Sequence, residues 1–162
     1  MADPAYIDAD GVLTDGEAWV ALNANVLTVD TTTVTWTSAD DGSSKDWSQF
    51  MDLVVIVYTK RDDTNNGVPS ITFNNDTGTN YSVQEFYGDG SSVTATSGNY
   101  AFVRMGLVAG SATDSGMFGC LVAHFFDINS GKYKSGISQY ATDADGSGNV
   151  GVNAHVWKNQ AA

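Results

Sequence analysis

Asp76 and its neighbours form the stretch of the sequence whose residue types and spacing most invite chemistry. The run Ile71–Ser82 reads ITFNNDTGTNYS, so one carboxylate stands among amide and hydroxyl side chains. Such oxygen donors can hold a metal ion, contact a sugar, or close a tight connection by bonding the local backbone. The three uses stay open for Asp76, although Asn, Asp and Gly together favour a hairpin between strands at 71–73 and 81–87.

Other candidate ligands and catalytic groups have unsuitable spacing. In the run Asp143–Asn149, DADGSGN, glycine falls at the fourth position of a calcium loop and Ala154 at the twelfth, where an EF-hand needs glycine sixth and glutamate twelfth. Cys120 and His124 lie four apart on one expected strand, roughly 13 Å from each other, which is too far for a nucleophile and its base. We therefore predict no catalytic residue, no metal site and no cofactor.

The charge balance limits the class of partner. Seven Lys and Arg residues stand against nineteen Asp and Glu residues, giving a net charge of −12. Nucleic acids and anionic membranes bind through clustered basic residues, so neither is an expected partner. The N-terminus lacks the basic and apolar regions of a secretory signal, which predicts synthesis in the cytoplasm. The one cysteine, Cys120, lies in an apolar run and is expected to be a buried free thiol.

Short apolar runs separated by turn-forming residues indicate an all-β domain. We expect strands over residues 25–30, 32–37, 53–60, 71–73, 80–87, 100–108, 118–128, 133–140 and 150–157. The run 53–60, LVVIVYTK, is apolar on both faces and predicts a central strand covered on both sides. The runs 80–87 and 150–157 alternate instead, and the residues that share one face are Tyr81, Val83, Glu85 and Tyr87 in the first and Val150, Val152, Ala154 and Val156 in the second. His155 alternates onto the less apolar face of the second run and is expected at the surface. A short helical turn is expected after Asp46, which suits an N-cap.

The predicted architecture is a single-domain antiparallel β-sandwich, of the jelly-roll type, with an extended N-terminal arm. The arm spans residues 1–16, which are acidic and poor in apolar residues, and the sandwich spans residues 17–162. A length of 162 residues suits one domain of ordinary size.

The run DWSQFMDLVVIVYTKRD, followed by ITFNNDTGTNYS, resembles a pattern of tailed-phage structural proteins. In these proteins a W…F.DL run leads into an apolar strand that ends in a basic residue, and a strand of the type FN.DTG.NYS follows. A Gly/Ser-rich loop comes next, here Tyr87–Val93, and then strands similar to FGCLVAHFFDI and GKYKSGIS. The likeness covers roughly residues 46–157, and FNNDTGTNYS matches best.

The resemblance implies a non-enzymatic virion protein, assembled in the host cytoplasm. The leading expectation is a capsid decoration (cement) protein on the outside of the phage head, with the major capsid protein and further copies of itself, as a homotrimer, for partners. A carbohydrate- or receptor-binding module of a tail or fibre, with exposed aromatic residues against sugars, is the alternative. Because the strand 118–128 is apolar on both faces, one face is expected to meet a neighbouring subunit. The expected capsid or subunit contacts are Tyr6, Ile7, Val12, Leu13, Met117, Leu121 and Phe125.

Overall fold

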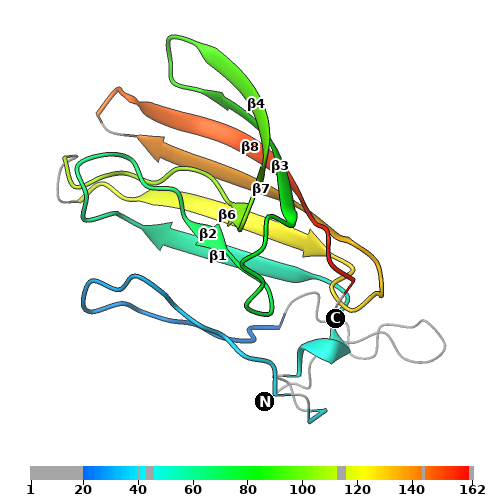
Figure 1. Ribbon diagram of the computed structural model, residues 1–162. Helices are drawn as coiled ribbons and strands as arrows, with labels where there is room; N and C mark the ends of the chain where they lie inside the picture. The colour runs from blue at the N-terminus through cyan, green and yellow to red at the C-terminus, as the bar shows by residue number, and fades with distance from the viewer. Residues whose placement is uncertain (1–19, 40, 43–45, 113–115, 144, 161–162) are drawn as a thin grey trace. The chain divides into compact units, whose positions relative to one another are not determined.

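The computed structural model describes residues 20–39, 41–42, 46–112, 116–143 and 145–160 (Figure 1). The chain divides into two compact units, Met1–Met51 and Asp52–Ala162. The predicted arm, residues 1–16, lies outside the described residues. The division between the two units falls after Met51. The boundary predicted after Gly16 also lies outside the described residues and stays a prediction.

The described part of the first unit contains no β-strand. The strands predicted at 25–30 and 32–37 are irregular, because a strand needs hydrogen-bonded neighbours and the described unit supplies none. Val26, Leu27 and Val29 are exposed, Val26 at 90 %, whereas Val34 and Trp36 are half-buried. A 3₁₀ helix, η1 (Trp47–Gln49), begins after Asp46, whose Oδ1 accepts from the Ser48 N–H at 2.9 Å. The predicted N-cap is therefore confirmed.

The second unit contains a six-stranded antiparallel sheet (Figure 1). Its strand order is β1-β6-β7-β8-β3-β4. The strands are β1 (Leu53–Thr59), β3 (Tyr81–Gly88), β4 (Val93–Tyr100), β6 (Gly119–Phe126), β7 (Lys134–Asp143) and β8 (Gly148–Trp157). The hairpins β3–β4 and β7–β8 join neighbours through short turns, while β1 pairs with β6 across a long connection.

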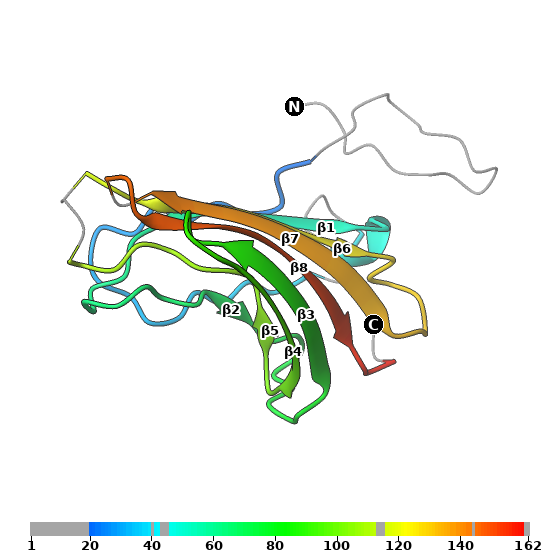
Figure 2. The ribbon, with the colours of Figure 1, turned by 90° about the horizontal axis from the view of Figure 1, so that it is seen from above.

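A second, much smaller layer lies on one side of this sheet. It consists of β2 (Ser70–Ile71) paired with β5 (Val103–Arg104), and Figure 2 shows the large sheet curving around it. Irregular backbone continues the layer, with the Met105 N–H donating to the Pro69 carbonyl at 3.0 Å and Gly67 bonded to Val108 in both directions. The all-β, antiparallel prediction is confirmed, and the jelly-roll assignment stays a prediction.

Two strands differ from their predicted roles. β1 lies at the edge of the sheet and not at its centre, and one of its faces is exposed at Ile56 and Tyr58. β4 was not predicted, because its sequence VTATSGNY is rich in small polar residues that are typical of loops. The predicted hairpin at 71–87 is also wrong, since β2 pairs with β5 and the run 72–80 crosses from the small sheet to the large one.

The core lies between the large sheet and the small layer. Its buried apolar residues are Val55, Tyr81, Val83, Val103, Met105, Val108, Ala109, Leu121, Ala123, Phe125, Tyr140 and Trp157. Within the described ranges, no helix is long and apolar enough to span a membrane.

Candidate interaction surface

The six-stranded sheet has an inner face toward the small layer and an outer face on the opposite side. We call the outward-pointing residues of its six strands the outer face. Directly paired residues share a face, so the strand register places them in rows across the sheet. One row runs Tyr58, Cys120, Ala141, Val150, Gly88, Val93, and the next runs Ile56, Val122, Gln139, Val152, Phe86, Ala95.

Apart from Gln139 on β7, these two rows form an exposed apolar patch. Ile56 is 75 % exposed, Tyr58 69 %, Val150 64 % and Phe86 56 %. With strands about 4.8 Å apart and rows about 7 Å apart, the patch measures roughly 24 Å by 13 Å, or about 300 Å² in projection. The Tyr58 ring also stacks on Phe118, with centroids 5.0 Å apart, which extends the patch at the β1 margin. Contiguous patches of this size on a protein surface commonly mark interaction sites.

Charge is excluded from this face. The outward-pointing strand residues, all within the described ranges, include no Asp, Glu, Lys or Arg until Asp143 at the end of β7. His124 is the only titratable nitrogen among them, and its Nε2 lies 2.9 Å from Asp52 Oδ2 at the β1 margin. A chain with nineteen acidic residues thus keeps one broad surface uncharged.

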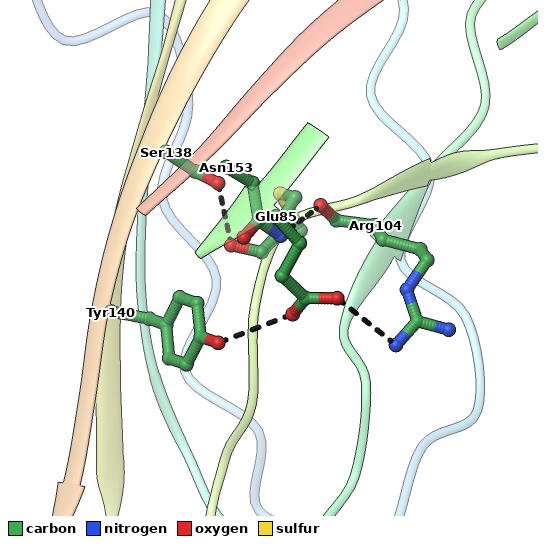
Figure 3. Close-up of polar contacts among 6 residues, drawn as sticks. Glu85, Arg104, Ser138, Tyr140 and Asn153 are labelled. Carbon is green, nitrogen blue, oxygen red and sulfur yellow. Dashed lines mark hydrogen bonds and ion pairs between the residues drawn. The ribbon is translucent and has the colours of Figure 1, made fainter. Parts of the chain in front are cut away.

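The inner face carries several buried polar side chains beside its apolar core residues (Figure 3). Ser138 Oγ on β7 donates to the Met105 carbonyl at 2.6 Å, and Asn153 Nδ2 on β8 donates to the Arg104 carbonyl at 2.8 Å. Both side chains are fully buried. They hold the irregular backbone of the small layer against the sheet, because that backbone lacks strand partners for its carbonyl groups.

A buried carboxylate lies on the inner face of β3 (Figure 3). Glu85 on β3 accepts a hydrogen bond from the Tyr140 hydroxyl at 3.1 Å, and its other oxygen lies 3.6 Å from the Arg104 guanidinium. Burial raises the pKa of Tyr140, and the Glu85 charge raises it further, so the hydroxyl keeps its proton and remains a donor. Arg104 also lies over the Tyr100 ring, 5.2 Å from its centroid.

The polarity of β8 is opposite to that of an ordinary half-exposed strand. In β8 the outward residues are Val150, Val152, Ala154 and Val156, while Asn153 and His155 point inward. A sheet with one solvent-exposed face normally turns its apolar residues inward and its polar residues outward. The apolar outer face indicates a surface that is covered when the protein does its work.

His155 is a buried residue that sequence reasoning placed on the surface. It is 2 % exposed, packs against Phe125 with ring centroids 5.7 Å apart, and neither ring nitrogen has a hydrogen-bond partner among the described residues. Burial lowers its pKa from 6.5 to about 4. The error arose because the alternation in β8 was read correctly but the apolar side was assigned to the core.

We expect acid to destabilise the protein through His155. The unfolded chain takes up this proton near pH 6.5 and the folded chain only near pH 4, so the unfolded state binds more protons in that window. Stability therefore falls as the pH drops from about 6.5 to about 4, by about 3 kcal/mol in total. Urea unfolding across this range measures the loss.

The variant His155→Leu removes the titrating group and is expected to flatten the pH dependence between 6.5 and 4. The matched control is His124→Gln, which changes the other histidine and should leave the dependence intact. An unchanged slope in His155→Leu contradicts the assignment.

Asp76 holds the crossing loop to the end of β8. Its carboxylate accepts from Trp157 Nε1 at 2.8 Å, from Asn80 Nδ2 at 3.0 Å and from the Gly78 N–H at 3.0 Å. These bonds, led by that of Trp157, lower its pKa from 3.8 to about 2. Of the three uses open to Asp76, the geometry supports the structural one, closing a connection of the backbone. Its carboxylate oxygens already accept hydrogen bonds from groups of the same chain.

Asp76→Ala is expected to lower the melting temperature by several degrees, and Asp76→Asn by less, since the amide keeps one acceptor oxygen. Because the folded pKa is below the unfolded value, the contribution of Asp76 is present above about pH 4 and is lost as the pH falls toward 2. Thermal unfolding followed by circular dichroism at pH 7 and at pH 3 tests this: the difference between wild type and Asp76→Ala should shrink at pH 3. Equal melting temperatures at pH 7 would refute the structural role.

The contact residues predicted from the sequence differ in their exposure in the structure. Leu121 and Phe125 are buried in the chain's own core, at 1 % and 2 % exposure, so neither is available to a partner. Met117, before β6, is half-buried. The predicted contacts Tyr6, Ile7, Val12 and Leu13 lie outside the described residues.

The exposed side of β6 is the one opposite Leu121 and Phe125. Cys120 and Val122 point outward on it, and Cys120 is exposed instead of buried as predicted. No signal in the sequence distinguishes this outer side of β6 from the inner one, because both sides are apolar.

A shallow hollow of about 430 Å³ lies beside the apolar patch. It is lined mainly by hydroxyl and amide side chains and small residues of β3, β4, β7 and β8, among them Ser82, Gln84, Ser97, Asn99 and Ser135. None of the described residues that line it is a Phe, Tyr or Trp, so it offers no ring on which a sugar can stack.

Among the described residues, no three His, Cys, Asp or Glu side chains are grouped so that they could hold a metal ion. Comparison of the chain with protein-family models, with curated proteins and with solved structures found no match.

Proposed function

We propose that this chain is a non-enzymatic structural subunit of a virus particle, a capsid decoration protein that docks through the outer face of its six-stranded sheet. The observation that carries the docking part is the exposed apolar patch of the outer face, where Ile56, Val122 and Val152 point outward. The virion part rests on the resemblance of residues 46–157 to tailed-phage structural proteins.

In this proposal the outer face binds the major capsid protein and does not bind the outer face of a second copy. Stacking two such faces would bring two chains of net charge −12 together over their whole breadth. A shell surface that offers an uncharged apolar patch meets no such repulsion. Apolar contact over the broad outer face then clamps neighbouring capsid subunits, and a homotrimer fits the three-fold positions of a shell.

The test is co-sedimentation of the purified protein with capsids assembled without this chain, in parallel with binding to host cells. Saturable binding to capsids, with little binding to cells, is expected. Binding to cells alone would overturn the proposal in favour of a receptor-binding module of a tail or fibre. The hollow lined by Ser82 and Asn99 is the one feature that favours that alternative, and its lack of an aromatic platform weakens it.

A further inference from the structure

We infer that residues 25–37 of one copy add a strand to the free edge of β1 in a second copy. The inference deepens the proposed function by naming a contact between copies. It concerns the edge of the sheet, whereas the proposed capsid contact uses the outer face.

The acceptor is the unpaired edge of β1. This strand pairs with β6 on one side only and ends the sheet. Its sequence, LVVIVYT, has seven residues with no charge, no proline and no glycine. Natural sheets protect their edge strands with lysine, proline or bulges, because a bare edge pairs with other chains. The register of β1 with β6 is continuous from Leu53 to Thr59, so no bulge interrupts this edge.

The donor is a segment with strand-forming sequence but no strand. Residues 25–37 read NVLTVDTTTVTWT, in which nine of the thirteen residues are Val or Thr, the β-branched types that favour strands. In the described chain they are irregular, and Val26, Leu27 and Val29 are 90 %, 50 % and 73 % exposed. Among the described residues, neither this strand-forming segment nor the outer edge of β1 has a strand partner.

Charge permits this pairing between copies. Residues 25–37 contain one charged side chain, Asp30, and β1 contains none. The contact therefore brings little of the −12 net charge of either copy into proximity. Main-chain hydrogen bonds supply the affinity in such strand addition, and alternate side chains supply the register.

Proline scanning of the donor, in the full-length protein, tests the inference. Consecutive N–H groups of a strand point to opposite sides, so one of Leu27→Pro and Thr28→Pro must remove a donor on the paired side. The matched controls Leu27→Ile and Thr28→Val keep the strand propensity. Sedimentation should give a multiple of 17.1 kDa for wild type and both controls, and 17.1 kDa for at least one proline variant.

Hydrogen exchange identifies the acceptor in the same samples. Amides of residues 25–37 and of β1 should both be protected in the oligomer, and both should lose protection in the monomeric proline variant. A wild-type mass of 17.1 kDa, with or without protected amides, overturns the inference, and so does an oligomer that persists in both proline variants. Capsid binding by a monomeric wild type would overturn this inference and leave the proposed function standing.

Discussion

Val152→Asp is expected to weaken binding to capsids by at least about 100-fold while leaving the fold intact. Val152 lies in the middle of the apolar patch, between Gln139 on β7 and Phe86 on β3, and its side chain points outward. A carboxylate covered by a partner without a counter-charge costs about 3 kcal/mol or more. The same carboxylate in the free protein remains in water, so unfolding should change little.

Two controls separate the effect of position from that of charge. Val152→Thr keeps the β-branched shape and should bind with a modest loss. Asn66→Asp adds the same charge on an exposed loop, away from the outer face, and should bind like wild type. Co-sedimentation titrations and circular-dichroism melts measure both properties. Equal affinity for Val152→Asp and Asn66→Asp would show that the patch is not the contact.

Arg104→Met is expected to destabilise the protein by about 2–3 kcal/mol. Its guanidinium is the cation beside Glu85, whose side chain is 5 % exposed, so its loss leaves a buried carboxylate with only the Tyr140 hydroxyl as partner. Removal of one partner of a buried pair costs more than replacement of both by neutral groups. Urea unfolding at pH 7 measures the change.

The double variant Arg104→Met with Glu85→Gln completes the cycle. The amide is uncharged and can still accept from Tyr140, so the double variant should recover part of the stability that Arg104→Met loses. A double variant that loses the sum of the two single losses would show that the two side chains do not interact across their 3.6 Å separation.

The alternation of the strands was the most predictable part of the fold. In β3, Tyr81, Val83 and Glu85 share one face, and Ser82, Gln84 and Phe86 share the other, as the sequence predicts. In β8 the set Val150, Val152, Ala154 and Val156 also shares a face as predicted. Strand alternation is a local property of the backbone, so it can be read from sequence spacing alone.

Which face is inside was not predictable from alternation. The apolar set of β8 lies outside, because the inner side chains must hydrogen-bond the backbone of the small layer, as Asn153 and Ser138 do. That requirement comes from the segment 102–110, far from β8 in sequence. For the same reason Cys120 and His155 were each assigned to the wrong side.

Which strands lie next to one another was also not predictable from the sequence. The apolar run of β1 suggested burial on both faces, yet its edge position leaves Ile56 and Tyr58 exposed. β4 forms because β3 offers it a continuous ladder from Tyr81 to Gly88, and not because VTATSGNY favours a strand. The role of Asp76 depends on Trp157, which lies eighty-one residues away.

The accessibility of Cys120 tests most directly whether the outer face is covered in the working assembly. It is the one cysteine of the chain, it is exposed, and it lies on the outer face between Tyr58 and Ala141. The rate of its reaction with a maleimide is measured for the free protein and for the protein bound to capsids, without any substitution. We predict fast reaction in the free protein and at least about 100-fold slower reaction in the bound one, because a covered thiol reacts only when the contact opens. Equal rates in the two states, with binding confirmed in the same sample, would contradict the account.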